Sequence, residues 1–230
     1  MLRAQMQDPY TMASRAKDKT AEPVRVEYDA LARSYERRWR RYLDVSSART
    51  LAALAPRDQE RILDAGCGTG LLLQRIAALA PGARLVGTDL TLAMLHQADR
   101  TVSDFVLGDV RRLPFDDGSL DAVVLASVLQ YLPDLNSTVA EAARVLRVGG
   151  RLVITLWDGE SLRVRMLGRW LRWRDRADVY LHTPGDVIAS CRDHGFVIRK
   201  EQAYPVDHMW RLVTLSAVKG TGGPGDRSAA

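Results

Sequence analysis

The residues that bear most directly on chemistry begin in one short stretch, residues 62–70, with the sequence ILDAGCGTG. There an apolar run leads to Asp64 and then to a turn of the form GxGxG. Glycines in such a turn let the backbone bend sharply and lie against a ligand. A second acidic residue, Asp89, follows nineteen residues after Gly70 and ends the strand-like run 84–88. A carboxylate in that place can accept hydrogen bonds from both hydroxyls of a ribose. The pattern therefore predicts a nucleoside-binding α/β domain.

The kind of nucleoside follows from what the turn lacks. The dinucleotide fingerprint GxGxxG needs a third glycine, and Leu71 stands in its place. The phosphate loop GxxxxGK[ST] is also absent. Asp64, which we place at the mouth of the turn, would repel a pyrophosphate but suits a cationic or amino-bearing ligand. An adenosine that carries a sulfonium and a free amino acid meets these demands.

Motifs further along the chain extend the pattern. In order they are LDAGCGTG at 63–70, GTD at 87–89, GDV at 108–110, LPF with DGSLD at 113–121, and RVLRVGGRL at 144–152. In this order and spacing the chain resembles the class I S-adenosylmethionine-dependent methyltransferases. It is most similar to the methyltransferase type 11 branch, which includes the ubiquinone and menaquinone methyltransferases. The resemblance covers roughly residues 26 to 218.

The resemblance implies a role for each matching residue. Backbone groups around the GxGxG turn would hold the methionine part of S-adenosyl-L-methionine, and Asp89 the ribose. Asp109 would accept from the adenine amine, and Ser127, after Ala126, would lie beside the methionine amino group. Taken alone, Asp109 could instead be an ordinary turn residue and Ser127 a helix cap. The expected cofactor residues are Asp64, Gly66, Cys67, Gly68, Asp89, Leu90, Asp109, Val110 and Ser127, and no metal is expected.

Composition limits the class of protein. A chain of 230 residues suffices for one domain with a full core. Its two cysteines lack metal or redox spacing, and it shows neither a signal peptide nor a transmembrane run, so we expect a cytoplasmic protein. The net charge is +5, and residues 161–176, with six arginines and one aspartate, carry the same excess. The charge elsewhere is balanced, so we expect no specific nucleic-acid partner.

Alternating strand and helix patterns predict a Rossmann-like, doubly wound α/β sheet of seven strands in a single domain. The resemblance implies that the last strand inserts antiparallel and that N-terminal helices form a lid. We expect disordered tails at 1–24 and 220–230, a methyltransferase domain at 25–219 and a substrate-lid insertion at 158–183. Predicted strands are 61–65, 84–88, 104–107, 121–126, 151–156, 196–204 and 210–218; predicted helices are 26–43, 69–79, 91–98, 134–147 and 184–194, with Gly149-Gly150 as a helix stop.

Residues for catalysis are harder to identify, because methyl transfer needs mainly alignment of the acceptor and exclusion of water. Many relatives have a histidine where Tyr131 stands, which puts a histidine-base mechanism in doubt. Tyr131 could orient or deprotonate an acceptor, or could simply pack. His208 precedes the last strand and is a second candidate base, although a lone histidine is more often a surface residue. The expected substrate residues are Tyr28, Tyr35, Trp170 and Trp210.

Leu162 to Arg176 could form a basic amphipathic helix. Arg165, Arg169, Arg172 and Arg176 would share one face, with Leu162, Met166, Trp170 and Trp173 on the other side. Such a helix suits an anionic membrane surface, and equally a lid with a solvated arginine face.

Three functions stay open: methyl transfer to a small, possibly lipophilic acceptor, methylation of RNA or DNA, and cofactor binding without transfer. The oligomeric state is also open.

Overall fold

The computed structural model describes residues 21–174 and 179–221 of the chain. The tails expected at 1–24 and 220–230 therefore lie largely outside the described residues. Residues 21–24 are an exception to the expected tail, because they form the first turn of helix α2. None of the described helices is long and apolar enough to cross a bilayer.

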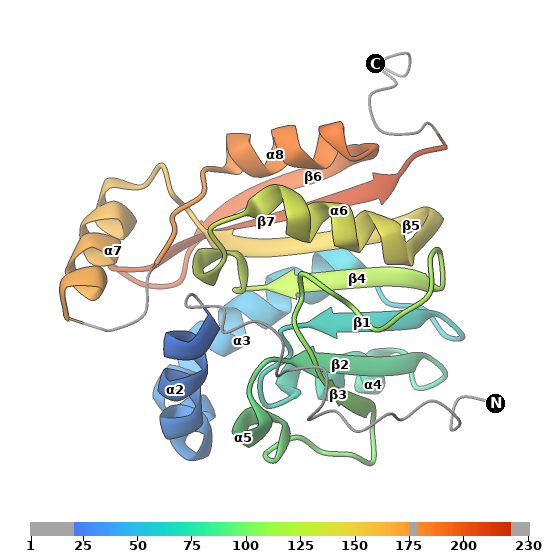
Figure 1. The fold of residues 1–230 in the computed structure, drawn as a ribbon, viewed down its shortest axis with the longest axis horizontal. Helices are drawn as coiled ribbons and strands as arrows, with labels where there is room; N and C mark the ends of the chain where they lie inside the picture. Colours follow the sequence, from blue (N-terminus) through green and yellow to red (C-terminus); the bar gives the residue numbers. More distant parts are fainter. Residues whose placement is uncertain (1–20, 175–178, 222–230) are drawn as a thin grey trace.

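Seven strands form one sheet in the order β3-β2-β1-β4-β5-β7-β6 (Figure 1). The first five strands run parallel, and β7 is antiparallel to both of its neighbours, β5 and β6. This confirms the expected mixed sheet with an antiparallel last strand. The strands are β1 (Arg61–Ala65), β2 (Arg84–Asp89), β3 (Asp104–Leu107), β4 (Leu120–Ala126), β5 (Leu146–Trp157), β6 (Phe196–Pro205) and β7 (Arg211–Lys219).

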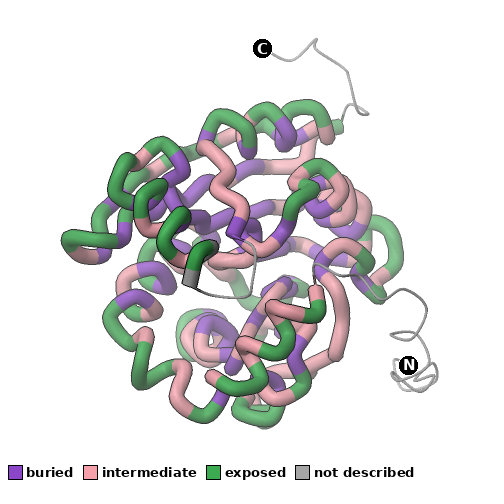
Figure 2. The backbone as a smooth tube through the Cα atoms, turned by 60° about the vertical axis from the view of Figure 1, so that its left-hand side comes forward, coloured by how far each residue is buried: buried purple, intermediate pink, exposed green. Residues whose placement is uncertain are grey.

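Helices cover both faces of the sheet because neighbouring residues along its central strands point to opposite sides. In β1, Leu63 belongs to the core on the side of α6 and α8, whereas Ile62 belongs to the core on the side of α3 and α4. Figure 2 shows the buried residues concentrated in the strands and on the inner sides of the helices. The longer helices are α2 (Ala21–Leu31), α3 (Tyr35–Leu54), α4 (Leu71–Leu79), α6 (Leu135–Val145), α7 (Leu162–Arg174) and α8 (Pro184–Asp193), with a short α5 (Leu92–Leu95) and 3-10 turns η1 (Ala32–Ser34) and η2 (Leu129–Tyr131).

The single helix predicted at 26–43 is wrong, since α2 and α3 are separated by the turn η1. No glycine or proline marks the break, where the sequence is Ala-Arg-Ser. Tertiary contacts account for it instead. Tyr28 of α2 bonds to Tyr131, and Tyr42 of α3 bonds to Ser127, so the two helices attach to different points of the loop after β4.

The glycines at 149–150 do not stop a helix. Helix α6 already ends at Val145, where Lys219 Nζ donates to the carbonyls of Ala143 and Leu146 at 2.7 and 2.8 Å. Strand β5 begins at once with Leu146, which pairs with Leu120 before the register shifts. The glycines lie inside this irregular stretch of β5, and Gly149 has a φ of 74°.

Helix α5 is also shorter than the predicted 91–98. Beyond Leu95 the backbone tightens to bonds three residues apart, such as that from Ala98 N to Leu95 O. The Asp99 carboxylate then accepts from Thr101 N at 2.9 Å, which forms a turn that competes with further helix.

Gly87 in β2 gives a test of the packing between the sheet and α4. A Cβ there would lie 2.7 Å from Cys67 Sγ, 2.8 Å from Phe105 Cδ1 and 2.9 Å from Leu73 Cδ1. We expect Gly87→Ala to lower the free energy of unfolding by about 1–3 kcal/mol through overpacking. The matched control is Gly185→Ala in α8, where the added carbon meets nothing nearer than 3.6 Å. Urea unfolding should show that control unchanged or stabilised by up to ~1 kcal/mol; equal effects at both sites would contradict the expectation.

Candidate functional site

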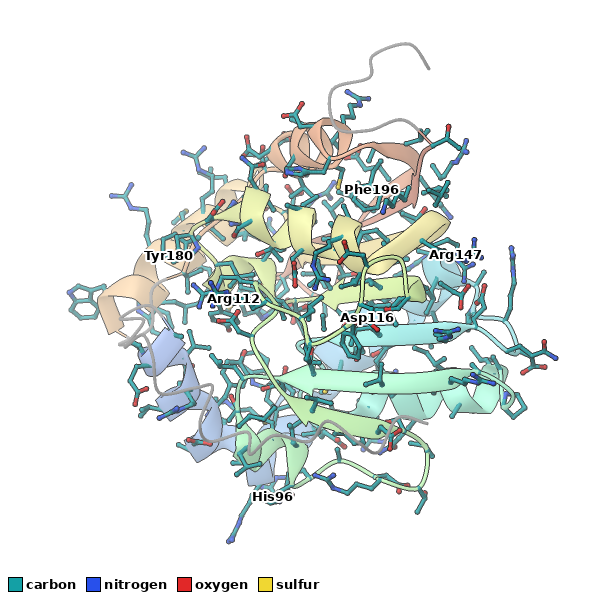
Figure 3. All side chains as sticks on the ribbon, turned by 45° about the vertical axis from the view of Figure 1, so that its right-hand side comes forward. His96, Arg112, Asp116, Arg147, Tyr180 and Phe196 are labelled. Atoms are coloured by element: carbon teal, nitrogen blue, oxygen red, sulfur yellow. The ribbon has the colours of Figure 1, made fainter. Side chains whose placement is uncertain are left out.

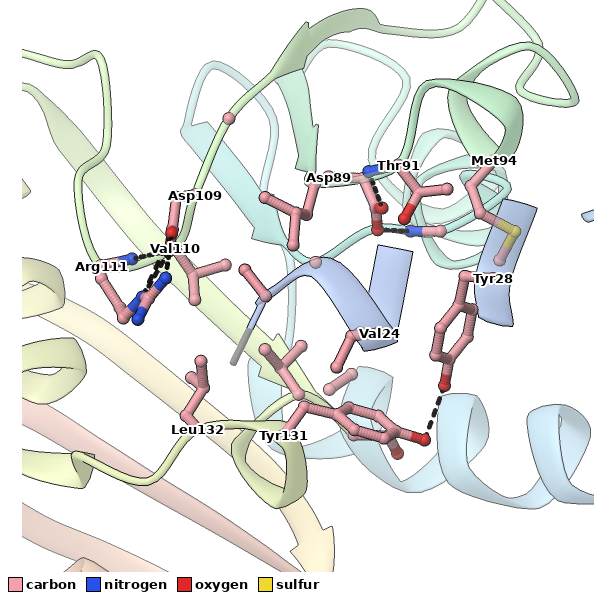
Figure 4. A pocket seen from close by; sticks show the side chains of 18 of the residues that line it. Val24, Tyr28, Asp89, Thr91, Met94, Asp109, Val110, Arg111, Tyr131 and Leu132 are labelled. Carbon is pink, nitrogen blue, oxygen red and sulfur yellow. Dashed lines mark hydrogen bonds and ion pairs between the residues drawn. The ribbon is translucent and has the colours of Figure 1, made fainter. Parts of the chain in front are cut away.

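A cavity lies at the carboxyl ends of β1, β2 and β4, with α2 along one side (Figure 4). It holds about 760 Å³ of empty space, part of it open to solvent. Parallel sheets bind ligands at this edge, where strand ends and the loops that follow them converge. The lining residues are Ala21, Val24, Tyr28, Tyr35, Gly66, Gly68, Asp89, Leu90, Thr91, Met94, Gly108, Asp109, Val110, Arg111, Ala126, Ser127, Val128, Tyr131 and Leu132.

The glycine turn forms the floor of this cavity. Gly66 has a φ of 83°, and a Cβ there would lie 2.3 Å from Val128 Cγ2, so no side chain fits. The amides of Gly66 and Cys67 donate to Thr88 O at 2.7 and 2.9 Å. These bonds tie the turn after β1 to the end of β2 and leave the backbone of Gly66 and Gly68 against the cavity.

Asp89 ends β2 and lines the cavity, as expected. Its Oδ2 accepts from Gly68 N and its Oδ1 from Thr91 N, each at 2.9 Å (Figure 4). Burial raises the pKa of Asp89, although these backbone hydrogen bonds oppose the shift. Each oxygen still has a lone pair for another donor, so the carboxylate can bind two neighbouring hydroxyls.

Asp64 does not stand at the mouth of the turn. It is 2% exposed and, with Cys67, is absent from the described residues that line the cavity. Its Oδ1 has no hydrogen-bond partner among the described residues. Burial, and then the charge of Asp89, raise the pKa of Asp64 to about 7. A buried carboxylate in this state favours a cation or a hydrogen-bond donor nearby.

Asp109 and Val110 line the cavity after β3, and Asp109 already has a charged partner. Arg111 Nε donates to Asp109 Oδ1 at 3.0 Å and Arg111 Nη2 to Oδ2 at 2.6 Å (Figure 4). Arg111 also lines the cavity, and our sequence analysis missed it. An aspartate followed two residues later by an arginine is the signal that could have indicated the pair. A ligand amine would have to share the Asp109 carboxylate with this guanidinium.

Ser127 lies where β4 ends, in the left-handed region with a φ of 59°. Its Oγ is 2.6 Å from Tyr42 Oη, which also accepts from Trp157 Nε1 at 3.0 Å. Its carbonyl accepts from Gln130 Nε2 at 2.7 Å, and its amide donates to Thr155 O at the same distance. A non-glycine residue rarely adopts this backbone conformation, so these bonds fix it. Ser127 is therefore a fixed point of the cavity wall rather than a helix cap.

Three tyrosines from separate elements form the wall opposite Asp109. Tyr28 Oη donates to Tyr131 Oη at 2.8 Å, with the rings nearly perpendicular and 5.6 Å apart (Figure 4). The Tyr35 ring lies 5.8 Å from that of Tyr28. Burial is the main cause that raises the pKa of both Tyr28 and Tyr35, so each keeps its proton at neutral pH. The wall thus offers aromatic surface and neutral hydroxyls.

None of the four histidines lines the cavity. His96 is exposed at the periphery (Figure 3), and ring nitrogens of His182 and His194 are bonded to the carbonyls of Leu132 and Ser190. His208, the candidate base, is exposed in the hairpin between β6 and β7, beside a separate surface hollow. The antiparallel last strand brings that hairpin to the expected edge of the sheet, but the histidine is exposed there and does not line the cavity.

Two expected substrate residues also lie elsewhere. Trp210 is buried, with its ring 4.5 Å from that of Trp157 and 5.7 Å from that of Tyr42, because the hairpin packs against α3. Trp170 is 46% exposed on α7. Tyr28 and Tyr35 do line the cavity, as expected.

The arrangement has the features of a site for a cationic nucleoside. It offers a glycine turn without room for side chains, a carboxylate held by two backbone amides at the end of β2, and a buried carboxylate with no counter-charge among the described residues. No group of three histidine, cysteine, aspartate or glutamate side chains in the described part of the chain could hold a metal ion.

Comparisons with known proteins agree with this geometry. A family model for a methyltransferase domain (Methyltransf_11) matches residues 63–154. The chain is 30% identical to a demethylmenaquinone methyltransferase of Thermobifida fusca, over 87% of this chain and 94% of that protein. It is 35% identical to the enzyme of that name from Mycobacterium sp. (strain KMS), over 86% of this chain and 91% of that protein.

Among solved structures, the magnesium protoporphyrin IX methyltransferase of Synechocystis PCC 6803 with bound SAH superposes with a TM-score of 0.70. The superposition covers 87% of this chain and 100% of that one at 18% sequence identity, a likeness that shows the fold alone. Three further curated relatives are longer, and the chain spans 35%, 63% and 61% of their lengths. The ordered motifs, the glycine turn and the near full-length relatives all agree. The chain therefore belongs to the class I S-adenosylmethionine-dependent methyltransferases, in the type 11 branch.

Proposed function

We propose that the chain binds S-adenosylmethionine in this cavity and transfers its methyl group to a small, lipophilic acceptor. The observation that carries the proposal is the composition of one continuous cavity. Its floor and one wall carry the groups that suit the cofactor, and its opposite wall is made of tyrosines and aliphatic side chains. A cofactor and an uncharged acceptor could therefore lie side by side.

The residues toward the cofactor have distinct roles in this proposal. Asp89 would bind the ribose hydroxyls while the amides of Gly68 and Thr91 hold its carboxylate in place. The backbone of Gly66 and Gly68 would lie against the methionine part, with Asp64 buried behind it as a counter-charge. Asp109 and Val110 would contact the adenine, with Arg111 fixing the Asp109 carboxylate.

The acceptor side has no residue suited to act as an ordinary base. Its hydroxyls belong to Tyr28, Tyr35 and Tyr131, and the described lining residues include no histidine, lysine or glutamate. The cofactor supplies a methyl carbon already activated by its positive sulfur. The chain's own residues would hold the acceptor atom in line with that carbon and exclude water. On transfer the cofactor would leave with a neutral sulfur, and an acidic acceptor would lose its proton to bulk solvent rather than to a residue of the tyrosine wall.

The names of the near full-length relatives support a ring-bearing, lipophilic acceptor, since both are demethylmenaquinone methyltransferases. A flat ring could stack against the tyrosine wall. The cavity favours such an acceptor over a nucleic acid, because the one arginine among its described lining residues, Arg111, is already paired with Asp109.

The proposal is tested by incubating the protein with methyl-labelled cofactor and a fractionated cell extract. Label in the lipid or apolar-metabolite fraction supports it. Label in RNA or DNA would favour nucleic-acid methylation, and cofactor binding without any labelled product would favour a protein that binds but does not transfer.

Replacing Asp89 tests the cofactor end. We expect Asp89→Ala to weaken S-adenosylmethionine binding roughly 10- to 150-fold, because a hydrogen bond to a charged group contributes about 1.5–3 kcal/mol. Calorimetry on a variant shown to be folded measures this. The matched control is Asp104→Ala, an exposed aspartate at the start of β3, which should bind normally. Unchanged affinity in Asp89→Ala would remove this residue from the site.

Asp64 gives a prediction about protons. Its pKa of about 7 means that the carboxyl is largely neutral below that pH and ionised above it. A cationic ligand favours the ionised form, so binding near neutral pH should release a proton and strengthen by up to roughly tenfold per pH unit as pH rises through 7. Titration calorimetry in two buffers of different ionisation enthalpy detects the release. Asp64→Asn should abolish it, and equal heats in both buffers for the unmodified protein would contradict the prediction.

The hydroxyls of the tyrosine wall give a third test. Tyr131→Phe and Tyr28→Phe should each lower turnover about 2- to 10-fold, the effect of one neutral hydrogen bond, while the Kd for the cofactor stays unchanged. His208→Ala is the control, since this exposed residue lies outside the cavity and should leave both quantities unaltered. Full activity in both tyrosine variants would leave ring packing alone as the function of the wall.

A further inference from the structure

Helix α7 packs against the protein through one face only. Val164 is fully buried, and Leu167 and Leu171 pack against the same aromatic core as Trp157 and Trp210. Gly168 lies on this face too, where a Cβ would come within 2.8 Å of Leu181 Cδ1. The buried face therefore differs from the apolar side expected from the sequence, which was Leu162, Met166, Trp170 and Trp173.

That expected apolar side faces solvent. Leu162 is 69% exposed, Met166 64% and Trp173 83%, with Trp170 beside them at 46%. Their spacing of four, four and three residues places them along one side of the helix. Met209, 42% exposed at the tip of the β6–β7 hairpin, lies beside the start of α7 in the same surface hollow as Leu162. These five residues, the apolar stripe, make up a large share of the exposed large hydrophobic side chains of the described chain.

Arginines flank the apolar stripe. Helical spacing puts Arg163 on one side of it and Arg165 and Arg169 on the other, and all three are exposed. Arg163 Nη1 also donates to His208 O at 3.0 Å, which joins α7 to the hairpin. Three acids lie near the start of α7: Asp158 is paired with Arg211, Asp207 accepts from Met209 N and Trp210 N, and Glu160 is exposed. Helix α7 itself contains no acidic residue, so its own charge beside the stripe is positive.

The stripe also lies close to the cavity. Figure 1 shows α7 and α2 at the same edge of the sheet, beyond the carboxyl ends of the parallel strands. The segment after α7 is bonded to the loop that carries Tyr131, since Tyr180 N donates to Gln130 O at 2.8 Å. A partner bound to the stripe would thus lie at the same edge of the sheet as the cavity.

We propose that the apolar stripe and its flanking arginines form a docking surface for anionic lipid bilayers. Tryptophan, methionine and leucine side chains enter the headgroup boundary, and arginines beside them pair with lipid phosphates. A second copy of the chain would also bury the apolar residues but would bring arginines against arginines, and a protein partner would need acidic groups matched to both flanks, whereas an anionic bilayer presents negative charge over its whole surface. The proposal does not rest on methyl transfer, so a protein that only binds the cofactor would dock equally.

The test is co-sedimentation of the full chain with vesicles of phosphatidylcholine and phosphatidylglycerol, compared with phosphatidylcholine alone. Binding should require the anionic lipid and should weaken as salt rises. Changing Arg165 and Arg169 to glutamine should lower the partition coefficient roughly 30-fold, the equivalent of about 1 kcal/mol for each arginine. The matched control removes the same charge from Arg192 and Arg199, which are exposed on α8 and β6 away from α7, and should bind normally.

A second variant tests the apolar part. Met166→Ser with Trp173→Ser should abolish sedimentation, whereas Leu79→Ser with Val148→Ser, which removes similarly exposed residues elsewhere, should not. Near-ultraviolet circular dichroism and cofactor binding establish that each variant is folded. Failure of the unmodified protein to sediment with anionic vesicles at low salt would overturn the proposal. So would equal loss in the control variants, or a dimer in sedimentation velocity that Met166→Ser with Trp173→Ser converts to a monomer.

Discussion

Two carboxylates beside one glycine turn, Asp64 buried and Asp89 half-buried, set the constraint on which the rest of the site depends. Loss of contact with water raises the pKa of both, and the charge of Asp89 raises that of Asp64 further. Burying an unpaired carboxylate is costly. The amides of Gly68 and Thr91 partly compensate Asp89, which requires a turn tight enough to aim the Gly68 N–H at it. Nothing described compensates Asp64 Oδ1, so a cationic ligand would relieve the remaining cost.

The loop after β4 connects the cofactor side of the cavity to the acceptor side. Ser127 adopts a left-handed conformation, and its groups are held by Tyr42, Gln130 and Thr155. Four residues later the same loop supplies Tyr131, to which Tyr28 donates. Helices α2 and α3 are therefore attached to the sheet edge through hydroxyl groups at two points of one loop. Displacing this loop would move the cofactor wall and the acceptor wall together.

Most of the sheet could be predicted from the sequence, because its strands are short apolar runs with clear bounds. Strands β1 and β3 begin and end where expected, and β2 and β4 differ by one residue. The failures have a common origin in contacts between distant residues. Neither the break at 32–34 nor the early end of α6 has a local signal, since the first depends on Tyr131 and Ser127 and the second on Lys219.

The two halves of the cavity differ in predictability for the same reason. The groups on the cofactor side come largely from the backbone at strand ends, so glycines and aspartates at fixed spacing in the sequence locate them. The role of Arg111 and the burial of Asp64 were not predicted. Groups toward the acceptor come from side chains of α2, α3 and η2, which only tertiary packing brings together. His208 and Trp210 lie in the hairpin at the expected edge of the sheet. Packing of this hairpin on α3 buries Trp210 and leaves His208 exposed to solvent.

That division also explains how a family with one cofactor site can accept many substrates. Changes in α2, α3 or η2 alter the acceptor wall without touching the strand ends that hold Asp64 and Asp89. Helix α7 is a further case, because Val164, Leu167, Gly168 and Leu171 pack it against the core while Leu162, Met166 and Trp173 on its other side are exposed. An exposed stripe of leucine, methionine and tryptophan there costs solubility without stabilising the fold. Contact with a partner such as an anionic bilayer would bury the stripe and remove that cost.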